Sequence, residues 1–299
     1  MATEEGVFKR GDVNLYTKAW TPAGPVTAKL IFVHGFSEHI NRYNDFFPKL
    51  SEAGIQVFGF DQRGWGRSTT KKAERGLTGP TSVVIADVAA FIEDKLPSAV
   101  PVFVMGHSMG GGEVLTLAAD PAYGSLVRQV RGWLLDAPFI GFAPEDAPSS
   151  AKVFVGRLVG RLLPRQQLKH EIPAEHLSRD PAVVAAVRDD PLCHNTGTLE
   201  GMASLLDRTG ALSSGAVALG ADVKSLFLAH GTADKTCSYD ASSRFFEAQP
   251  TPDKTHKPYE GAYHQIHADL CKDDFARDII AWIAARCDNR ESVPAESKL

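Results

Sequence analysis

Apolar positions along the chain follow two periods in alternation. Short runs rich in β-branched and aromatic residues predict strands, and apolar residues every three or four positions between them predict helices. The expected strands cover residues 14–20, 28–33, 56–60, 102–105, 132–135, 225–228 and 255–259. The expected helices cover residues 43–53, 81–95, 108–119, 239–249 and 273–286. Most central strands are apolar throughout, as in a parallel sheet covered on both faces, so the pattern predicts an α/β sandwich.

The alternation of strand and helix stops between residues 141 and 217, where turns containing proline and amphipathic stretches take its place. We therefore expect a single domain over residues 1–299, with a helical cap, or lid, inserted at 141–217. Residues 288–299 are polar and predict a disordered tail.

A serine stands at the most informative junction of the chain. Residues Gly106–Gly110 read Gly-His-Ser-Met-Gly and lie between a run typical of a strand and a helical pattern. At such a turn the serine adopts a strained conformation, and the flanking glycines let the backbone turn tightly. A glycine-rich turn beside an ordinary serine would match the motif as well. The strand before the motif and the helix after it favour a nucleophile, Ser108.

A serine nucleophile requires an acid and a histidine base, which follow it in that order in this arrangement. Asp136 and Asp234 both end apolar strands. Asp234 is favoured as the acid because a turn containing glycine carries it into a loop, whereas Asp136 is expected to cap the turn after its strand. His264 is favoured as the base because it lies between a strand and a helix. His267 is the alternative, and His256 is expected in a solvated loop.

Two backbone N–H groups must stabilise the oxyanion that forms when a serine attacks an ester. One belongs to Met109, directly after the nucleophile, and the other comes from the loop after an early strand, where Phe36 is the expected donor. His107 and His230 lie at strand ends and are interpreted as hydrogen-bonded structural histidines.

Composition narrows the function mainly by exclusion. The 299 residues are 43% hydrophobic and can bury a large core, and the net charge of −4 lacks the basic footprint of a nucleic-acid-binding protein. The acidic start does not resemble a secretory signal, and no apolar run reaches the length of a membrane span. The 4 cysteines have no metal-ligand spacing. We therefore expect a cytoplasmic protein with reduced thiols.

Four segments together resemble one known family. They are residues 34–43, Gly106–Gly110, Asp234 with Cys237 three residues later, and Tyr259–His267. From near its start to about Arg286 the chain resembles the monoacylglycerol lipases, a branch of the α/β-hydrolase fold. The resemblance implies hydrolysis of a long-chain monoester of glycerol by Ser108, Asp234 and His264, without a metal or cofactor.

The resemblance also implies a small polar pocket for glycerol, lined by Glu38, Arg42 and His267. The alternative is that Glu38 and Arg42 form a surface ion pair. Animal members of the family carry a tyrosine shortly before the motif Asp190–Leu192, and Val187 stands there in this chain. This replacement leaves the head-group preference open.

Residues 152–165 carry aliphatic side chains at helical spacing, with Arg157 and Arg161 on the flank. A basic amphipathic stripe of this kind can lie on a membrane or lipid-droplet surface, and it can also roof an acyl tunnel. The expected partner is a monoacylglycerol or a similar lipid ester, with peripheral contact between the cap and a lipid surface.

Other functions remain open at this stage. A lysophospholipase or a broad carboxylesterase would use the same triad, because the cap decides the leaving group. A non-catalytic binding protein of the same fold is disfavoured, since such a protein has no reason to keep a complete triad and both oxyanion loops. Cys237, close to the expected acid, is either a regulatory thiol or a small apolar residue packed under the loop.

Overall fold

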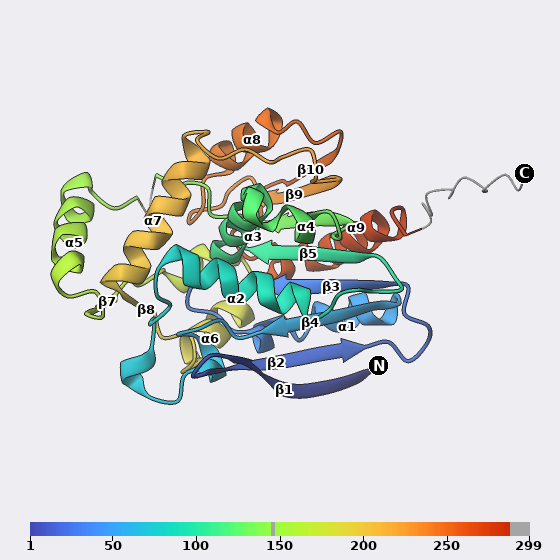
Figure 1. The fold of residues 1–299 in the computed structure, drawn as a ribbon, viewed down its shortest axis with the longest axis horizontal. Coiled ribbons are helices and arrows are strands. Elements are labelled where there is room, and N and C mark those ends of the chain that lie inside the picture. Colours follow the sequence, from blue (N-terminus) through green and yellow to red (C-terminus); the bar gives the residue numbers. More distant parts are fainter. Residues whose placement is uncertain (145–146, 288–299) are drawn as a thin grey trace, which may run out of the picture.

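The computed structural model describes residues 1–144 and 147–287 (Figure 1). They form an eight-stranded sheet whose strands lie in the order β1 (Ala2–Arg10), β2 (Val13–Thr21), β4 (Ile55–Phe60), β3 (Ala28–Val33), β5 (Val102–His107), β6 (Gly132–Asp136), β9 (Ser225–Gly231), β10 (Asp253–Tyr259). The strands from β4 to β10 are parallel to one another, whereas β2 is antiparallel to β4 and β1 to β2. The tail predicted at 288–299 lies outside the described residues.

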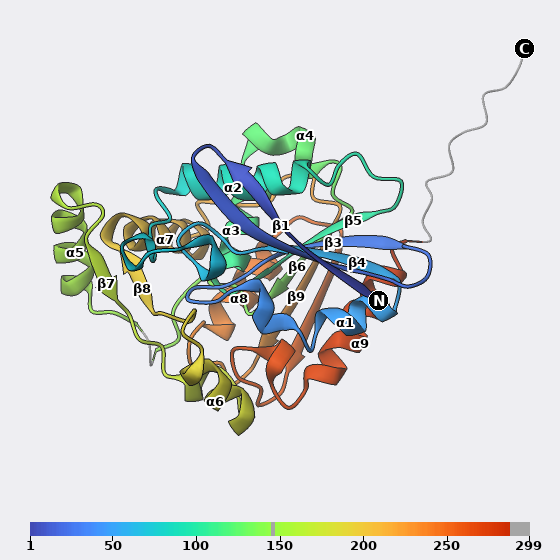
Figure 2. The same ribbon diagram turned by 90° about the horizontal axis from the view of Figure 1, so that it is seen from below.

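Alternation of side chains along the central strands builds a hydrophobic core on each face of the sheet. Ile31 and Val104 pack on one face, and Phe32 and Phe103 pack on the other. The first face is covered by α2 (Thr81–Glu93), α3 (Met109–Ala119), α4 (Gly124–Val127) and α8 (Tyr239–Ala248), and the second by α1 (Phe47–Glu52) and α9 (Lys272–Ala284). Figure 2 shows α2 and α4 on the opposite side of the sheet from α1 and α9. The predicted α/β sandwich is confirmed.

Each predicted strand and helix is present, with ends that differ by a few residues. Strand β1 was not expected, because its residues are mostly exposed and include Glu4, Glu5 and Lys9, so the strand has no regular apolar face. The placement of His256 in a solvated loop is wrong. His256 lies within β10, half-buried, and its ring stacks on Tyr239.

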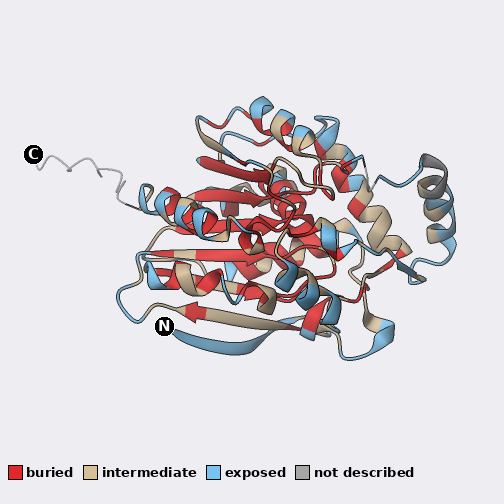
Figure 3. Cartoon of the chain, turned by 180° about the vertical axis from the view of Figure 1, so that it is seen from behind, coloured by how far each residue is buried: buried red, intermediate tan, exposed pale blue. Residues whose placement is uncertain are grey.

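The described part of the segment predicted as a cap, residues 141–144 and 147–217, lies beyond the carboxyl ends of β3 and β5 (Figure 1). It contains α5 (Ser150–Leu162), β7 (Gln167–Lys169), α6 (Pro181–Asp189), β8 (Thr196–Thr198) and α7 (Leu199–Ser213). The antiparallel pair β7 and β8 was not expected, since three residues are too few to show a period. In Figure 3 buried residues fill the central strands of the sheet, whereas the described part of the cap segment is mostly exposed or intermediate. Among the described residues, no helix combines the length and apolar character needed to cross a bilayer.

Candidate active site

Ser108 occupies a sharp turn between β5 and α3. Its backbone has φ +52°, a conformation that residues other than glycine rarely adopt. The chain passes so close to itself here that a Cβ at Gly106 would lie 2.4 Å from the carbonyl oxygen of Gly110. A Cβ at Gly110 would lie 2.3 Å from the carbonyl oxygen of Val33. The glycines on both sides of the serine are therefore required by the packing as well as by the turn.

Three side chains from separate loops meet at the carboxyl end of the sheet. Ser108 Oγ lies 2.9 Å from His264 Nε2, and His264 Nδ1 lies 2.8 Å from Asp234 Oδ2. Because a carboxylate only accepts, His264 donates its Nδ1–H to Asp234, which leaves Nε2 to accept the serine O–H. All three residues of this predicted triad are brought together in the order nucleophile, base and acid.

The Asp234 carboxylate is fully hydrogen-bonded. Oδ2 also accepts from His230 Nε2 at 3.0 Å, and Oδ1 accepts from the backbone N–H groups of Thr236 and Cys237 at 2.7 and 3.0 Å. Burial alone would raise the pKa of Asp234. The electrostatic attraction of His264 and the hydrogen bonds from His230 and His264 outweigh burial and lower the pKa well below its usual range. Asp234 is thus held as an anion, and the structural role expected for His230 is confirmed.

The loop after β3 places Phe36 beside the nucleophile. Phe36, Ser108 and Met109 line one cavity, as a pair of oxyanion donors requires. A Cβ at Gly35 would lie 2.8 Å from Glu38 Oε2 and 3.1 Å from the Cβ of Ser108, so this loop packs directly against the serine.

Glu38 lies beneath the same loop and is buried, so the alternative of a surface ion pair with Arg42 is wrong. Its Oε2 accepts the N–H of Gly35 at 2.9 Å and the hydroxyl of Tyr43 at 2.8 Å, and its Oε1 accepts the side-chain amide of Gln265. Burial opposes ionisation, but the charge of His107 outweighs it, and the pKa of Glu38 falls to about 2.

His267 does not lie in the wall of the small polar cavity, where it was expected. It follows His264 by three residues, but the turn Ile266–Ala268 directs its ring to Asp136, with Nδ1 2.8 Å from Oδ2. His107 Nδ1 lies 3.1 Å from the same oxygen, which confirms the structural role expected for His107. Asp136 is therefore a fully buried acceptor for two histidines rather than the cap of a turn. Within the described part of the chain, the walls of the two cavities that Ser108 lines include neither His267 nor Asp136.

Two cavities of unequal size and character meet at Ser108 and Phe36. The larger, of about 610 Å³, extends under the cap segment. Its walls are mostly apolar and include Phe139, Phe142, Met202, Leu205, Leu206 and Cys237. Cys237 is fully buried, with Sγ 3.9 Å from Ser108 Oγ. The apolar wall of this cavity suits an aliphatic chain.

The smaller cavity has a volume of about 40 Å³ and also has Ser108 in its wall. Glu38, Arg42, Asn195 and Gln265 contribute polar groups, and Leu177, Val187 and Cys193 contribute apolar ones. Glu38 and Arg42 thus lie together as expected. Gln265 lines the cavity where His267 was expected. The signal for Gln265 was its position directly after the expected base.

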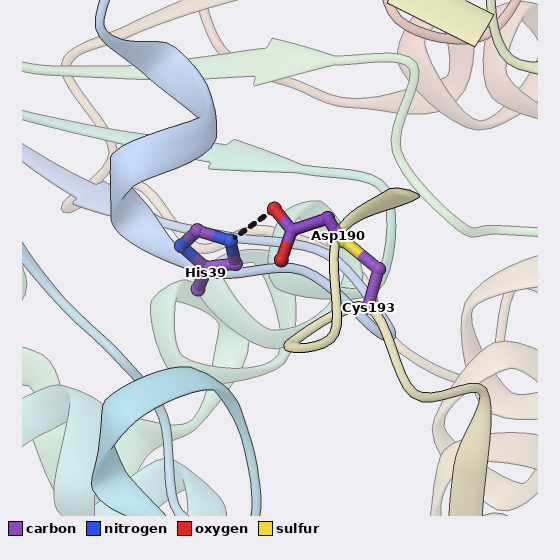
Figure 4. Close-up of side chains that lie close together, drawn as sticks. All are labelled: His39, Asp190 and Cys193. Atoms are coloured by element: carbon purple, nitrogen blue, oxygen red, sulfur yellow. Dashed lines mark hydrogen bonds and ion pairs between the residues drawn. The ribbon is translucent and has the colours of Figure 1, made fainter. Parts of the chain in front are cut away.

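Cys193 and Arg42 of this small cavity belong to a cluster that joins the core and the cap segment. Figure 4 shows Cys193 beside His39 and Asp190. His39 Nε2 lies 2.8 Å from Asp190 Oδ2, and Arg42 Nη1 lies 3.7 Å from the same oxygen. His39, Asp190 and Cys193 offer ligand atoms within 4.8 Å of one another, as a metal site would. The Asp190 carboxylate already has two cationic or donor partners, however, and burial raises the pKa of the Cys193 thiol to about 12. This chemistry suits a link between cap and core better than a cation site.

Comparison with known proteins agrees with this geometry. The family model described as serine aminopeptidase, S33, matches residues 24–270. The monoglyceride lipase of Rattus norvegicus is 32% identical over 91% of this chain and 87% of its own length. The monoacylglycerol lipase of Mycolicibacterium smegmatis is 29% identical over 92% of this chain and 94% of its own.

Solved structures are similar over almost the whole chain. A soluble variant of monoglyceride lipase from Saccharomyces cerevisiae, in complex with a substrate analog, has a TM-score of 0.83 at 22% identity and covers 96% of this chain and 97% of its own. The monoacylglycerol lipase of Paleococcus ferrophilus has a TM-score of 0.79 at 28% identity and covers 91% and 99%.

The fold is therefore that of the α/β hydrolases, and the class is that of the serine-dependent hydrolases of carboxylic esters. Within this class the chain belongs to the serine aminopeptidase S33 family and to its monoglyceride lipases.

Proposed function

We propose that this protein cleaves monoacylglycerols to a fatty acid and glycerol through an acyl-enzyme intermediate. One observation carries the proposal: a serine hydrogen-bonded to a histidine lies where a large apolar cavity meets a small polar one. The larger cavity would hold the acyl chain, and the smaller one would hold the alcohol.

In the first half of the reaction, Ser108 Oγ attacks the ester carbonyl while its proton passes to His264 Nε2. Asp234 accepts the Nδ1–H of His264, which keeps the ring in the required tautomer and stabilises its charged form. The negative charge on the carbonyl oxygen is stabilised by the backbone N–H groups of Phe36 and Met109.

Collapse of this intermediate breaks the bond to the alcohol, which leaves with the proton from His264. A water molecule then gives a proton to the same nitrogen and attacks the acyl-enzyme, so that fatty acid is released and Ser108 regains its proton. The chain's own residues supply each proton transfer, and the proposal assigns no step to a metal or cofactor.

The size of the smaller cavity favours a monoester over a diester. A water molecule needs roughly 10–15 Å³ measured in the same way, so about 40 Å³ accommodates a small polyol but no second acyl chain. A lysophospholipid head group would also exceed this space, although Arg42 could pair with its phosphate.

We further propose that the cap segment rests on a lipid surface, in a protein that otherwise resides in the cytoplasm. Helix α5 has exposed apolar side chains at Val155, Leu158, Val159 and Leu162, whereas Val153 lines the larger cavity. Residues 147–170 include 3 arginines and 2 lysines and no acidic residue, which favours an anionic surface. Both orientations considered for this stripe thus have support.

Hydrolysis of three lipids with the same acyl chain tests the substrate assignment. Purified protein should release fatty acid from the monoacylglycerol much faster than from the diacylglycerol or the lysophospholipid. The Ser108→Ala variant provides the background rate. Faster release of fatty acid from the lysophospholipid would contradict the proposal and identify the protein as a lysophospholipase.

A further inference from the structure

Some polar groups of the small cavity already have all their hydrogen-bond partners within the protein, and others do not. Glu38 accepts hydrogen bonds on both oxygens, from Gly35, Tyr43 and Gln265. A carboxylate engaged in this way holds the loop that carries Phe36 and has little capacity left for a ligand hydroxyl. The group that receives the alcohol must be sought elsewhere in the cavity.

Gln265 lines this cavity and is 2% exposed. Its backbone N–H donates to the carbonyl of Leu177 in the cap segment at 2.7 Å, which fixes its position between core and cap. Its side-chain amide must turn its NH₂ to Glu38, because an ionised carboxylate accepts hydrogen bonds and repels a carbonyl oxygen. The amide oxygen Oε1 is thereby directed away from Glu38.

Among the described residues, Gln265 Oε1 is buried and has no hydrogen-bond partner, and the same holds for Arg42 Nε. Buried polar atoms of this kind are uncommon, because leaving them unpaired is costly. Both residues line the small cavity. One offers an acceptor and the other a donor, and the hydroxyl groups of an alcohol can pair with both kinds of atom.

We propose that Gln265 determines specificity for the alcohol part of the ester: its Oε1 accepts a hydrogen bond from a free hydroxyl next to the ester, while Arg42 Nε donates to that alcohol. The inference rests on the proposed function and adds a residue to it. The preferred substrates are esters of a vicinal diol or triol, and esters of plain alkanols of equal length leave the acceptor unpaired.

Two soluble butyrate esters test this assignment, glycerol monobutyrate and propyl butyrate, since they share the acyl group and differ in the hydroxyls. Gln265→Met keeps the side-chain length and removes the acceptor. We expect it to lower the ratio of kcat/KM for the glycerol ester to that for the propyl ester about tenfold, the effect of one lost hydrogen bond. Gln265→Asn, which withdraws the amide by one methylene group, should lower the same ratio.

Gln249→Met is the matched control. Gln249 is also buried, but its amide is fully used, since it accepts from the N–H of Leu219 and donates to the carbonyl of Phe245. This variant should leave the ratio unchanged. An equal loss on both esters in the Gln265 variants, or no loss on either, overturns the inference. Absence of activity on both esters in the wild-type protein would instead overturn the proposed function.

Discussion

The carboxyl end of the sheet and the cap segment meet at Ser108 but are built in different ways. At the end of the sheet, the side chains of the triad are buried, and Asp234 accepts four hydrogen bonds. In the cap segment, α5 leaves Leu158 54% and Leu162 81% exposed. From this difference we infer that the core fixes the reacting groups, and we propose that the cap segment determines which esters reach them.

A few buried polar contacts join the two regions. Arg208 on α7 pairs with Glu113 on the nucleophile helix α3 at 3.2 Å, and its other nitrogen donates to Thr81 Oγ1 at 3.1 Å. His39 and Asp190 form a second link. The comparison can therefore be tested separately in the core, at the links and at the outer face.

The largest effect is expected in the core. Ser108→Ala and His264→Ala should each lower turnover by several orders of magnitude, and Asp234→Asn should cost less, because the triad acts as a unit. Labelling with a fluorophosphonate probe measures the nucleophile directly. If Ser108→Ala still takes up one equivalent of probe, another residue is the nucleophile.

A bulky group on Cys237 should lower turnover roughly a hundredfold, since displacement of the reacting groups by about 1 Å has an effect of that size. Cys237 lines the larger cavity, and its backbone N–H donates to Asp234 Oδ1. Inhibition by a maleimide, followed over time, provides the measurement, and Cys237→Ala should be active and resistant. Equally fast inhibition of that variant would assign the effect to another thiol.

Breaking the link between α7 and α3 should destabilise the protein without removing the nucleophile. Glu113→Leu leaves the buried guanidinium of Arg208 unpaired and should cost about 3–5 kcal/mol. Arg208→Met should cost less, because burial already raises the pKa of Glu113 to about 7 and the carboxyl can take up a proton. Urea denaturation of both variants gives the two free energies of unfolding. Equal losses would contradict this asymmetry.

The histidine pair on Asp136 predicts a dependence of stability on pH. Burial would lower the pKa of His107, but Asp136 and Glu38 outweigh it and raise the pKa to about 9. A raised pKa stabilises the fold fully below the unfolded value near 6.5, and this contribution is lost as the pH rises towards 9, on the order of 3 kcal/mol. Denaturation midpoints between pH 6 and 9.5 measure it.

Asp136→Asn is the comparison for this pH series. It should lower stability at neutral pH and flatten the decline, while turnover stays near normal. A collapse in turnover with the fold intact by circular dichroism would move the role of catalytic acid to Asp136.

The smallest effect is expected at the outer face of α5. Leu158→Ser with Leu162→Ser should reduce sedimentation with anionic liposomes at least roughly tenfold, since each buried side chain contributes about 1.5–3 kcal/mol. Hydrolysis of a short soluble ester should change little. Val7→Ser, at another exposed apolar residue on β1, is the control. If the double variant binds liposomes as well as the wild-type protein does, the outer face of α5 does not contact lipid and the helix only roofs the larger cavity.

Local sequence was sufficient to predict the elbow and the order of the triad. The turn at Ser108 needs glycine on both sides and a strand and a helix around it, and each of these requirements is visible within a few residues. Asp234 and His264 could be selected because parallel strands deliver their following loops to one edge of the sheet.

The small cavity could not be predicted in the same way. His267 and Gln265 are two positions apart, one within and one just before the 3₁₀ turn Ile266–Ala268, and of the two only Gln265 lines the small cavity. That turn is fixed by Asp136, more than a hundred residues away in the chain, whose carboxylate takes the Nδ1–H of His267. Spacing alone does not contain this long-range hydrogen bond, nor the contact between Gln265 and Leu177.

Phe36 contributes to both cavities at Ser108. Its ring packs edge-on against Trp65 at 4.8 Å, and it forms part of the wall of both cavities, while its backbone is an expected oxyanion donor. A mutation at Phe36 that enlarges either cavity would also displace the backbone N–H that is expected to stabilise the oxyanion. Engineering of the acyl range should therefore begin at Met202 or Leu205 and that of the alcohol at Val187, where a change in fit need not slow the chemistry.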